Sequence, residues 1–460
     1  MSSHTRPQPG IRLRVDLDGD LRPRRNVKIE AHLQVDVAAD GAPTDLPAVE
    51  LAVIVAVDVA ESNRAAIDGL AAALRALPDG ISFSLLGSGP EPARCYPRGA
   101  DDWAVAGQHE RRRAAFVAGS LPLHRDRPRP AGYAAWAAAA RALLAGRPLS
   151  VQHLVLITDG SSAAGESRLE EELQACAGQF TCDVFAVGTD WPPDPLLTLA
   201  ERLHGTAEFV DGTLTQAITG AIQRLRRVHT PQLPIEVTVR PSVRQVSLSE
   251  KAPRPHRLGG LPRPGRPHRW SFPTYQWEQG RRDYLLTLVA DADADPLETE
   301  LQFAMVSVGE VHAPVVARWH LPDRSPPHAP AGADSVRSLN VTARMRSALR
   351  QGLVALDAHR RDTAEDCLGQ AARLAAQLGK EWVLDEIRTV ADIEDATAGR
   401  IRLRSVDAGT LGPMILRAGS RPGGPLTEAV GARPGPHCQV CGTPAGSEAR
   451  YCISCGKELR

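Results

Sequence analysis

Four cysteines near the end of the chain have the spacing of a metal site. Cys438 and Cys441 are separated by two residues, Cys452 and Cys455 repeat this spacing, and a glycine follows each pair. Two intervening residues let a tight turn present both thiolates to one ion, and the glycine supplies the positive φ that such a turn needs. Four thiolates complete the tetrahedral shell that Zn²⁺ prefers, which leaves no open position. The sequence therefore predicts one structural zinc per chain.

Other interpretations of this tail remain. His437 adjoins the first cysteine and is an alternative ligand, although four thiolates make it unnecessary. Redox pairs or disulfides are further alternatives, but a thioredoxin-like site needs a strand-to-helix context, which so few apolar residues cannot build. The segment resembles the short zinc ribbons at the ends of many bacterial proteins. Because it is too short for a core, the metal must supply its folding free energy. The resemblance implies a module that docks on a partner.

Two carboxylates follow two strongly apolar segments. Asp58 ends the run that starts at Leu51, and Asp159 follows Val151–Ile157 and one threonine. Continuous Val, Ile and Leu runs of this length indicate central parallel strands that are buried on both faces. Open α/β sheets bind ligands at the carboxyl ends of such strands. We therefore expect both aspartates at one ligand-binding edge.

This pair of strands resembles the von Willebrand factor type A (vWA) family. In that family two serines, a loop threonine and nearby aspartates hold one divalent cation at this edge, and hard oxygen ligands imply Mg²⁺. Asp58, Ser62 and Asp159 match the family pattern, whereas Ala60 replaces a serine and Pro130 stands at the threonine position. The resemblance thus implies a degenerate metal-ion-dependent adhesion site. It favours a binding platform that works without a metal, with Mg²⁺ binding as the less favoured alternative.

The elements around these carboxylates alternate between strand and helix patterns. Residues 48–229 contain apolar strand segments separated by helical periodicity, which predicts an α/β fold with a doubly wound, mainly parallel sheet. This length suits the resembled domain. The strands and helices would bring Asp58, Ser62 and Asp159 together at one end of the sheet.

Strand patterns without helices flank this α/β region. Residues 11–47 contain two segments of alternating apolar residues, and residues 230–322 contain about six more. Together they predict a β-sandwich into which the vWA domain is inserted. The alternative adds the N-terminal strands to an edge of the α/β sheet.

The remaining segments are shorter. Residues 1–10 are polar and expected to be disordered, and the apolar spacing within 334–398 predicts an α-helical hairpin. Residues 400–436 hold glycine, proline and arginine with little periodicity, which predicts a flexible linker. The zinc ribbon would occupy 437–460.

Composition excludes several classes of protein. The 460 residues include 54 basic and 54 acidic side chains, so no overall field recruits nucleic acid or membrane. There is neither an N-terminal apolar segment nor a run long enough to span a bilayer. The few scattered cysteines are not a disulfide framework and fit a reducing compartment. We expect a cytoplasmic protein.

Three weaker signals have plain structural alternatives. Residues 240–282 carry ten basic and two acidic residues with interleaved aromatics, which is typical of nucleic-acid binding but also of an Arg-rich loop. Asp291, Asp293 and Asp295 alternate, but they lack the glycine and glutamate of a calcium loop. His204 and His229 have no evident partner, so no catalytic dyad is predicted.

These patterns predict a protein-interaction scaffold or adaptor that uses the vWA domain and the zinc ribbon, within a bacterial multiprotein complex or stress-response system. The alternative is a nucleic-acid-associated protein that uses the ribbon and the Arg-rich 240–282 loop. No catalytic constellation is present in the sequence, so we expect neither an enzyme nor a small-molecule substrate. The expected partners are other proteins rather than a membrane, and their identity and the oligomeric state are outside what one sequence reveals.

Overall fold

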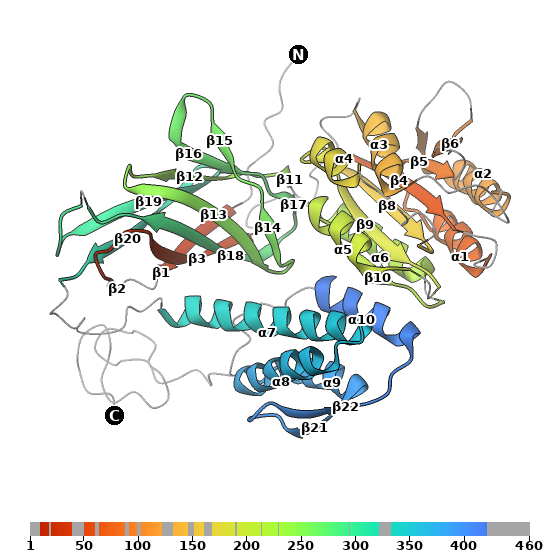
Figure 1. The fold of residues 1–460 in the computed structure, drawn as a ribbon. Helices are drawn as coiled ribbons and strands as arrows, with labels where there is room; N and C mark the ends of the chain where they lie inside the picture. Colours follow the sequence, from red (N-terminus) through yellow and green to blue (C-terminus); the bar gives the residue numbers. More distant parts are fainter. Residues whose placement is uncertain are drawn as a thin grey trace, which may run out of the picture.

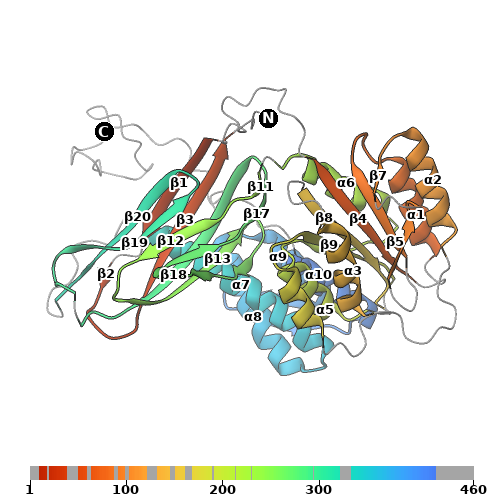
Figure 2. The same cartoon turned by 90° about the horizontal axis from the view of Figure 1, so that it is seen from above.

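The computed structural model contains a parallel-sheet region, an antiparallel region and a helical region, which Figures 1 and 2 show from two directions. The structure describes residues 10–17, 20–38, 50–59, 64–87, 92–98, 103–121, 132–145, 151–160, 168–188, 191–212, 214–228, 230–293, 295–321 and 333–420. The expected zinc ribbon at 437–460 lies outside these residues. The expected disorder at 1–10 does too, except that Gly10 begins a strand.

The parallel-sheet region confirms the predicted fold class. Its strands lie in the order β10-β9-β8-β4-β5-β6, with β7 also paired to β5, and only β6 and β7 run antiparallel to their neighbour. Its elements are β4 (Leu51–Asp58), α1 (Arg64–Arg75), β5 (Ser82–Gly87), β6 (Ala93–Tyr96), β7 (Ala104–Val105), α2 (Gln108–Gly119), α3 (Tyr133–Leu144), β8 (Val151–Thr158), α4 (Leu169–Cys176), β9 (Thr181–Ala186), α5 (Pro193–Arg202), β10 (Ala207–Phe209) and α6 (Leu214–Arg226).

Helices cover both faces of this sheet, which explains why β4 is apolar throughout. All eight residues of β4 are buried. Ile54 and Ala56 lie in the core beneath α3, α4 and α5, whereas Val53 and Val55 lie in the opposite core beneath α1, α2 and α6. Successive side chains of a strand point to opposite faces, so a central strand covered on both sides has no polar face to present.

The antiparallel region combines strands that precede the parallel-sheet region in the sequence with strands that follow it. One sheet has the order β1-β3-β18-β13-β14, another has the order β15-β16-β12-β19-β20-β2, and β11 pairs with β17. The strands are β1 (Gly10–Leu17), β2 (Asp20–Leu21), β3 (Val27–Ala38), β11 (Thr230–Gln232), β12 (Ile235–Val239), β13 (Val243–Ala252), β14 (His256–Leu258), β15 (Leu261–Arg263), β16 (Arg266–Phe272), β17 (Tyr275–Trp277), β18 (Gly280–Ala290), β19 (Glu300–Val308) and β20 (Val311–Trp319).

The strand pairing shows which sheets the N-terminal strands join. β3 pairs with β18 over eleven positions, from Val27 opposite Ala290 to Val37 opposite Gly280, and β2 pairs with β20. Residues of both large sheets share one apolar core. The alternative, in which these strands extend the α/β sheet, is therefore wrong, because their alternating apolar faces pack into this second core.

The description of 240–282 as a loop is wrong. This segment forms strands β13 to β17 and the start of β18, and several of its arginines are ion-paired within the fold. Arg240 contacts Asp295 at 2.7 Å, and Arg263 and Arg269 both contact Glu236. The charges therefore pair strands with one another, and the segment is not a free cationic surface.

The helical region is larger than the hairpin predicted at 334–398. It consists of α7 (Ala333–Asp357), α8 (Arg361–Leu378), α9 (Glu381–Val390), the antiparallel pair β21 (Ala391–Asp395) and β22 (Arg400–Leu403), and α10 (Ala408–Ser420). Gly379 ends α8 with a φ of 62°, and the next amide, of Lys380, donates to Ala375. This left-handed cap turns the chain directly into α9.

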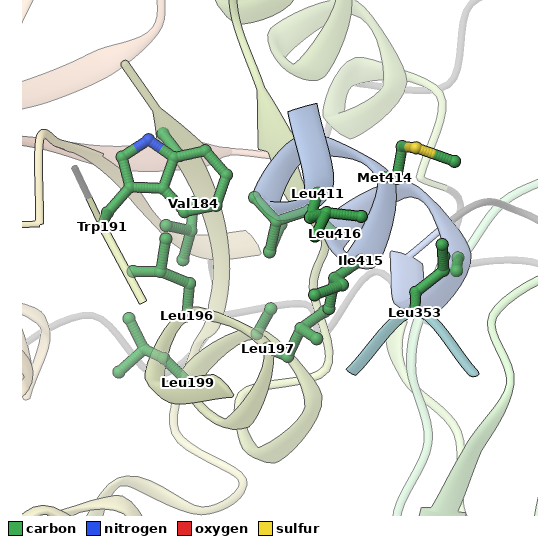
Figure 3. Packing of buried hydrophobic residues seen from close by; sticks show 14 of the residues in the cluster. Val184, Trp191, Leu196, Leu197, Leu199, Leu353, Leu411, Met414, Ile415 and Leu416 are labelled. Atoms are coloured by element: carbon green, nitrogen blue, oxygen red, sulfur yellow. The ribbon is translucent and has the colours of Figure 1, made fainter. Parts of the chain in front are cut away.

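The expectation of a flexible linker over 400–436 is wrong for 400–420. Ile401 and Leu403 are buried within β22, and α10 buries Met414, Ile415 and Leu416. Figure 3 shows these α10 side chains between Leu353 of α7 and the leucines of α5. The sequence did not predict this helix because α10 contains Pro413 and neighbouring glycines, and both residue types normally indicate irregular chain.

Helix α10 joins the helical region to the parallel sheet. Its buried residues belong to the same core as Trp191 and Leu197. At its end the Ser420 hydroxyl accepts a hydrogen bond of 3.0 Å from the backbone amide of Ala207, in the edge strand β10. The helix therefore covers the apolar side of α5. It also accepts a hydrogen bond from the Ala207 amide, which points away from the neighbouring strand at the edge of the sheet.

Candidate functional site

The carboxyl edge of the parallel sheet brings together two of the predicted site residues. Asp58 ends β4 and lies in register with Thr158, the last residue of β8, and Asp159 follows at once. The backbone amide of Asp159 donates to the carbonyl oxygen of Asp58 at 3.1 Å. Ser62, Ala60 and Pro130 lie outside the described residues, so the other predicted positions of the metal site are not placed.

Thr158 holds the buried Asp58 carboxylate. Its hydroxyl donates to Asp58 Oδ2 at 2.9 Å and accepts the amide of Gly160 at 3.1 Å, while Tyr133 Oη lies 3.3 Å away. Because a threonine hydroxyl has one hydrogen and that hydrogen goes to Asp58, Tyr133 must be the donor in its contact. The Thr158 hydroxyl is thus fully used, and Tyr133, Thr158 and Asp58 form one buried chain of hydrogen bonds.

This chain of hydrogen bonds bears on the metal site that the vWA resemblance implies. Asp58 is fully buried and Asp159 is 8% exposed, so the described edge offers one carboxylate held inside the fold and one near its surface. Among the described residues no cluster of three His, Cys, Asp or Glu side chains could hold an ion. The described geometry gives Asp58 a hydrogen-bonding partner in Thr158. We call Tyr133, Asp58, Thr158 and Asp159 the carboxyl-edge site.

A second polar group lies at the amino ends of β8 and β9, where the antiparallel region meets the parallel sheet. His153, Thr181 and Asp183 come from the sheet, and Gln276 and Arg254 come from β17 and the β13–β14 turn. All but Arg254 are buried. We call these five residues the junction network. Figures 1 and 2 place β17 on the side of the antiparallel region that faces the parallel sheet.

The hydrogen bonds of the junction network orient Gln276 and His153. Arg254 Nη1 donates to Gln276 Oε1 at 3.1 Å, so the Gln276 amide nitrogen is the end that meets His153 Nδ1 at 3.2 Å. His153 Nδ1 also lies 2.7 Å from the Thr181 hydroxyl, so both contacts are made by this nitrogen and the other ring nitrogen is Nε2. That nitrogen faces Asp183 Oδ2 at 3.4 Å.

Asp183 is the anion of this network. Its Oδ1 accepts hydrogen bonds from the Thr206 amide at 2.8 Å and hydroxyl at 2.9 Å, and Arg224 lies 3.4 Å from Oδ2. Burial alone would raise its pKa, but His153, Arg254 and Arg224 outweigh burial and hold the pKa of Asp183 well below its usual range. A charge-assisted network therefore joins the two regions.

Sequence reasoning missed the junction network and one of its neighbours. His204, for which no partner was evident, has its Nδ1 3.0 Å from Nε2 of His256, and its ring lies against Tyr275. His229 lies outside the described residues. Gln276 has a φ of 51°, which is uncommon for any residue except glycine, but no sequence pattern marks such a position in advance. Asp291, Asp293 and Asp295 form ion pairs with Arg244, Arg25 and Arg240, which explains them without calcium.

Comparison with known proteins supports the fold. The family model for the von Willebrand factor type A domain matches residues 51–209. A von Willebrand factor type A structure from Catenulispora acidiphila superposes with a TM-score of 0.78 at 20% identity, covering 92% of this chain and 99% of that one. The ArnB paralog VWA2 from Sulfolobus acidocaldarius has a TM-score of 0.52 at 10% identity, covering 89% and 98%.

No curated protein matches the chain. None of the described helices combines the length and apolarity that crossing a lipid bilayer requires. The parallel order of the sheet, the aspartates at its carboxyl edge and the matched family model agree. Residues 51–209 are a von Willebrand factor type A domain.

Proposed function

We propose that this protein is a non-catalytic scaffold or adaptor that binds other proteins through the carboxyl edge of its vWA domain, within a bacterial multiprotein complex or stress-response system. Domains of this type commonly mediate protein–protein interactions. The observation that carries the proposal is the direction of the sheet. The junction network contacts the amino ends of β8 and β9, at His153 and Thr181. The carboxyl-edge site therefore lies at the opposite end of these strands, about 17 Å further along β8.

The proposed edge works without a metal. Thr158 occupies one oxygen of Asp58, and the sequence offers Ala60 and Pro130 where the vWA pattern has hydroxyl ligands. Ser62 and Asp159 retain oxygen atoms, but a cation there would lack two hydroxyl ligands of the vWA pattern and would depend on water to complete its shell. The degenerate adhesion site would then act as a shaped, hydrogen-bonding surface.

The proposed scaffold also includes a zinc ribbon formed by Cys438, Cys441, Cys452 and Cys455. Its support is the spacing of the four cysteines in the sequence. Elemental analysis should find one zinc per intact chain and none in a chain that ends at Ser420. The truncation is placed there because an earlier end would remove α10 from its core. Zinc retained by the shortened chain would contradict the ribbon.

We propose a cytoplasmic location on the basis of the cysteines. Cys95, Cys176, Cys182 and Cys367 are all free thiols in the part of the chain that the structure describes. Burial raises the pKa of Cys95 to about 11 and that of Cys176 to about 12, so these thiols are poor nucleophiles at neutral pH. Unreactive free thiols suit a reducing compartment and a protein without cysteine catalysis.

Affinity isolation tests the scaffold proposal. The intact chain, isolated from its own organism, should carry a defined protein partner that survives nuclease treatment. Asp159→Ala should lower the recovery of that partner, because this side chain lies at the carboxyl edge. Asp68→Ala is the matched control, since Asp68 is an exposed acid on α1 of the same domain. Equal loss in both variants, or none in either, would contradict a docking role for the edge.

The alternative, a nucleic-acid-associated protein, makes a different prediction. Binding to DNA or RNA would weaken steeply with salt, because released counterions drive it. The internal ion pairs of 240–282, such as Arg263 and Arg269 with Glu236, do not favour this alternative. Recovery of nucleic acid that is lost between low and moderate salt would favour it over the scaffold.

A further inference from the structure

A groove of about 580 Å³ lies on one flank of the antiparallel region. Strands β13, β14 and β18 of one large sheet line it, together with β16 of the other sheet and the β14–β15 connection at Gly259 and Gly260. No residue of the carboxyl-edge site or of the junction network contributes to its lining. The groove is therefore a separate surface of the molecule.

The groove follows an unpaired strand edge. β14 pairs only with residues 248–250 of β13, and the chain then crosses to β15 in the other sheet. On its other side β13 pairs with β18, in a regular register from Gln245 to Ser247. No strand among the described residues pairs with residues 243–247 on the β14 side. Such an edge presents backbone N–H and C=O groups with which a further strand can pair.

Both faces of β13 contribute to the groove. Four consecutive residues, 244–247, line it, although successive side chains of a strand point to opposite faces. Val246 packs against the core between the sheets, whereas Gln245 lies opposite Val289 of β18, which is outside that core. A groove on one face would be lined by every second residue. This groove therefore runs along the edge itself, where an added strand would direct its side chains to both faces.

The core side of the groove is aromatic. Trp270 and Phe272 of β16 line it, and Trp270 is only partly buried. The chain passes close to both rings at Gly260, where a Cβ atom would lie 2.5 Å from the ring of Phe272 and 3.2 Å from that of Trp270. The glycine thus lets the backbone hold these rings in place. The accessible part of Trp270 can receive an apolar side chain.

The outer side of the groove carries one cation without a partner. No acidic residue lines the groove, and its basic residues are Lys28, Arg244 and Arg257. Lys28 forms an ion pair with Glu30, and Arg244 forms one with Asp291. Arg257 is exposed and pairs with no acid in the part of the chain that the structure describes. An acidic side chain in the groove would complement this charge.

We propose that this groove binds an extended, acidic segment of a partner protein as an added strand on β13. The backbone of the segment would pair with residues 243–247. Its apolar side chains would pack on Trp270 at the core side, and an acidic side chain between them would face Arg257 at the outer side. This is a second docking surface, and it goes beyond the role proposed for the carboxyl edge.

Fluorescence anisotropy with a labelled peptide tests the added strand. The probe is acetyl-Thr-Val-Asp-Val-Thr-amide, which alternates like a strand and carries one acid. We expect saturable binding to the intact chain with a Kd below about 1 mM. The same peptide with N-methylated backbone amides is the control, because it keeps the side chains but cannot donate to a strand edge. It should bind at least about tenfold more weakly. No saturable binding, or equal binding of the two peptides, would overturn the proposal.

A charge swap makes the test specific. Arg257→Glu should raise the Kd of the probe by about fivefold or more, and a peptide with lysine in place of the aspartate should bind this variant as tightly as the probe binds the unchanged chain. A structural role of Arg257 alone would not give this rescue. Arg266→Glu is the matched control, since Arg266 is exposed on β16 but does not line the groove. An unchanged Kd in Arg257→Glu, or no rescue by the lysine peptide, would contradict an acidic segment in the groove.

Sedimentation velocity of the chain identifies the other possible occupant. If the groove serves a partner protein, the chain should have the same oligomeric state with and without the probe. A larger species that the probe dissociates would assign the groove to a second copy of this chain instead.

Discussion

The two ends of the vWA sheet use buried aspartates in opposite ways. At the carboxyl edge Asp58 is held by a neutral hydroxyl, Thr158, whose second neighbour is the phenol of Tyr133. At the amino end Asp183 faces His153 and Arg224 and accepts two hydrogen bonds from Thr206.

The difference separates the roles of the two ends. Charge-assisted contacts are roughly twice as strong as neutral ones and hold a fixed geometry, which suits a permanent junction between regions. The described partner of Asp58 is a neutral hydroxyl, whereas Asp183 also faces a guanidinium. Our proposal assigns exchangeable partners to the carboxyl edge.

The largest effect is expected from Asp183→Asn. The amide keeps the shape but removes the charge that accepts the Thr206 hydrogen bonds and faces Arg224, and losing charge-assisted hydrogen bonds costs about 2–3 kcal/mol. Urea unfolding followed by circular dichroism measures this loss. Asp68→Asn, at an exposed position of the same domain, should change stability by no more than about 0.5 kcal/mol. A loss below about 1 kcal/mol in Asp183→Asn would erase the distinction between the two ends.

A smaller effect is expected from Asp58→Asn. The Thr158 hydroxyl can still donate to the remaining carbonyl oxygen, so the substitution should cost no more than about 2 kcal/mol. The same unfolding measurement applies, with both variants compared in one buffer. A larger loss than that of Asp183→Asn would reverse the comparison and make the carboxyl edge the stronger structural anchor.

Acid should destabilise the junction through Asp183. Its pKa in the folded protein is well below the value near 3.9 of an unfolded aspartate, so its contribution to stability is fully present above that value. The contribution is lost as pH falls below about 4 towards the folded pKa. Unfolding midpoints at pH 7, 5 and 3.5 should therefore fall less steeply for Asp183→Asn than for the unchanged chain. Parallel slopes would assign acid sensitivity to other groups.

The smallest effect is expected from magnesium. A domain that works without a metal gains no binding free energy from the ion, so 10 mM MgCl₂ should shift Tm by less than about 1 °C relative to NaCl at equal ionic strength. Differential scanning fluorimetry is sufficient. A rise of several degrees that disappears in Asp159→Ala would show that the carboxyl edge still binds a cation.

Sequence patterns predicted the parts of the fold whose cause is local. The uninterrupted apolar run of Leu51–Val57 fits only a strand covered on both faces, and the structure has it at the centre of the sheet. Thr158 could have been predicted as the partner of Asp58, because it ends the neighbouring strand one residue before Asp159. Helix α10 could not be, since its apolar face is interrupted by the helix-breaking Pro413.

The junction network was beyond local reasoning for a different reason. His153 and Gln276 are 123 residues apart, and His204 and His256 are 52 apart. Each of these side chains alone has many possible environments, and only the docking of two regions decides which groups meet. Buried polar partners at such separations depend on topology and not on periodicity.

The position of α10 has a consequence for assembly. A sheet normally offers two edges on which a strand from another molecule can pair. Here the β10 edge is closed by a helix from the same chain, through the contact of Ser420 with Ala207. Strand addition to the vWA sheet is thereby directed to the far side, beyond β6, and stacking of two copies through their β10 edges is prevented.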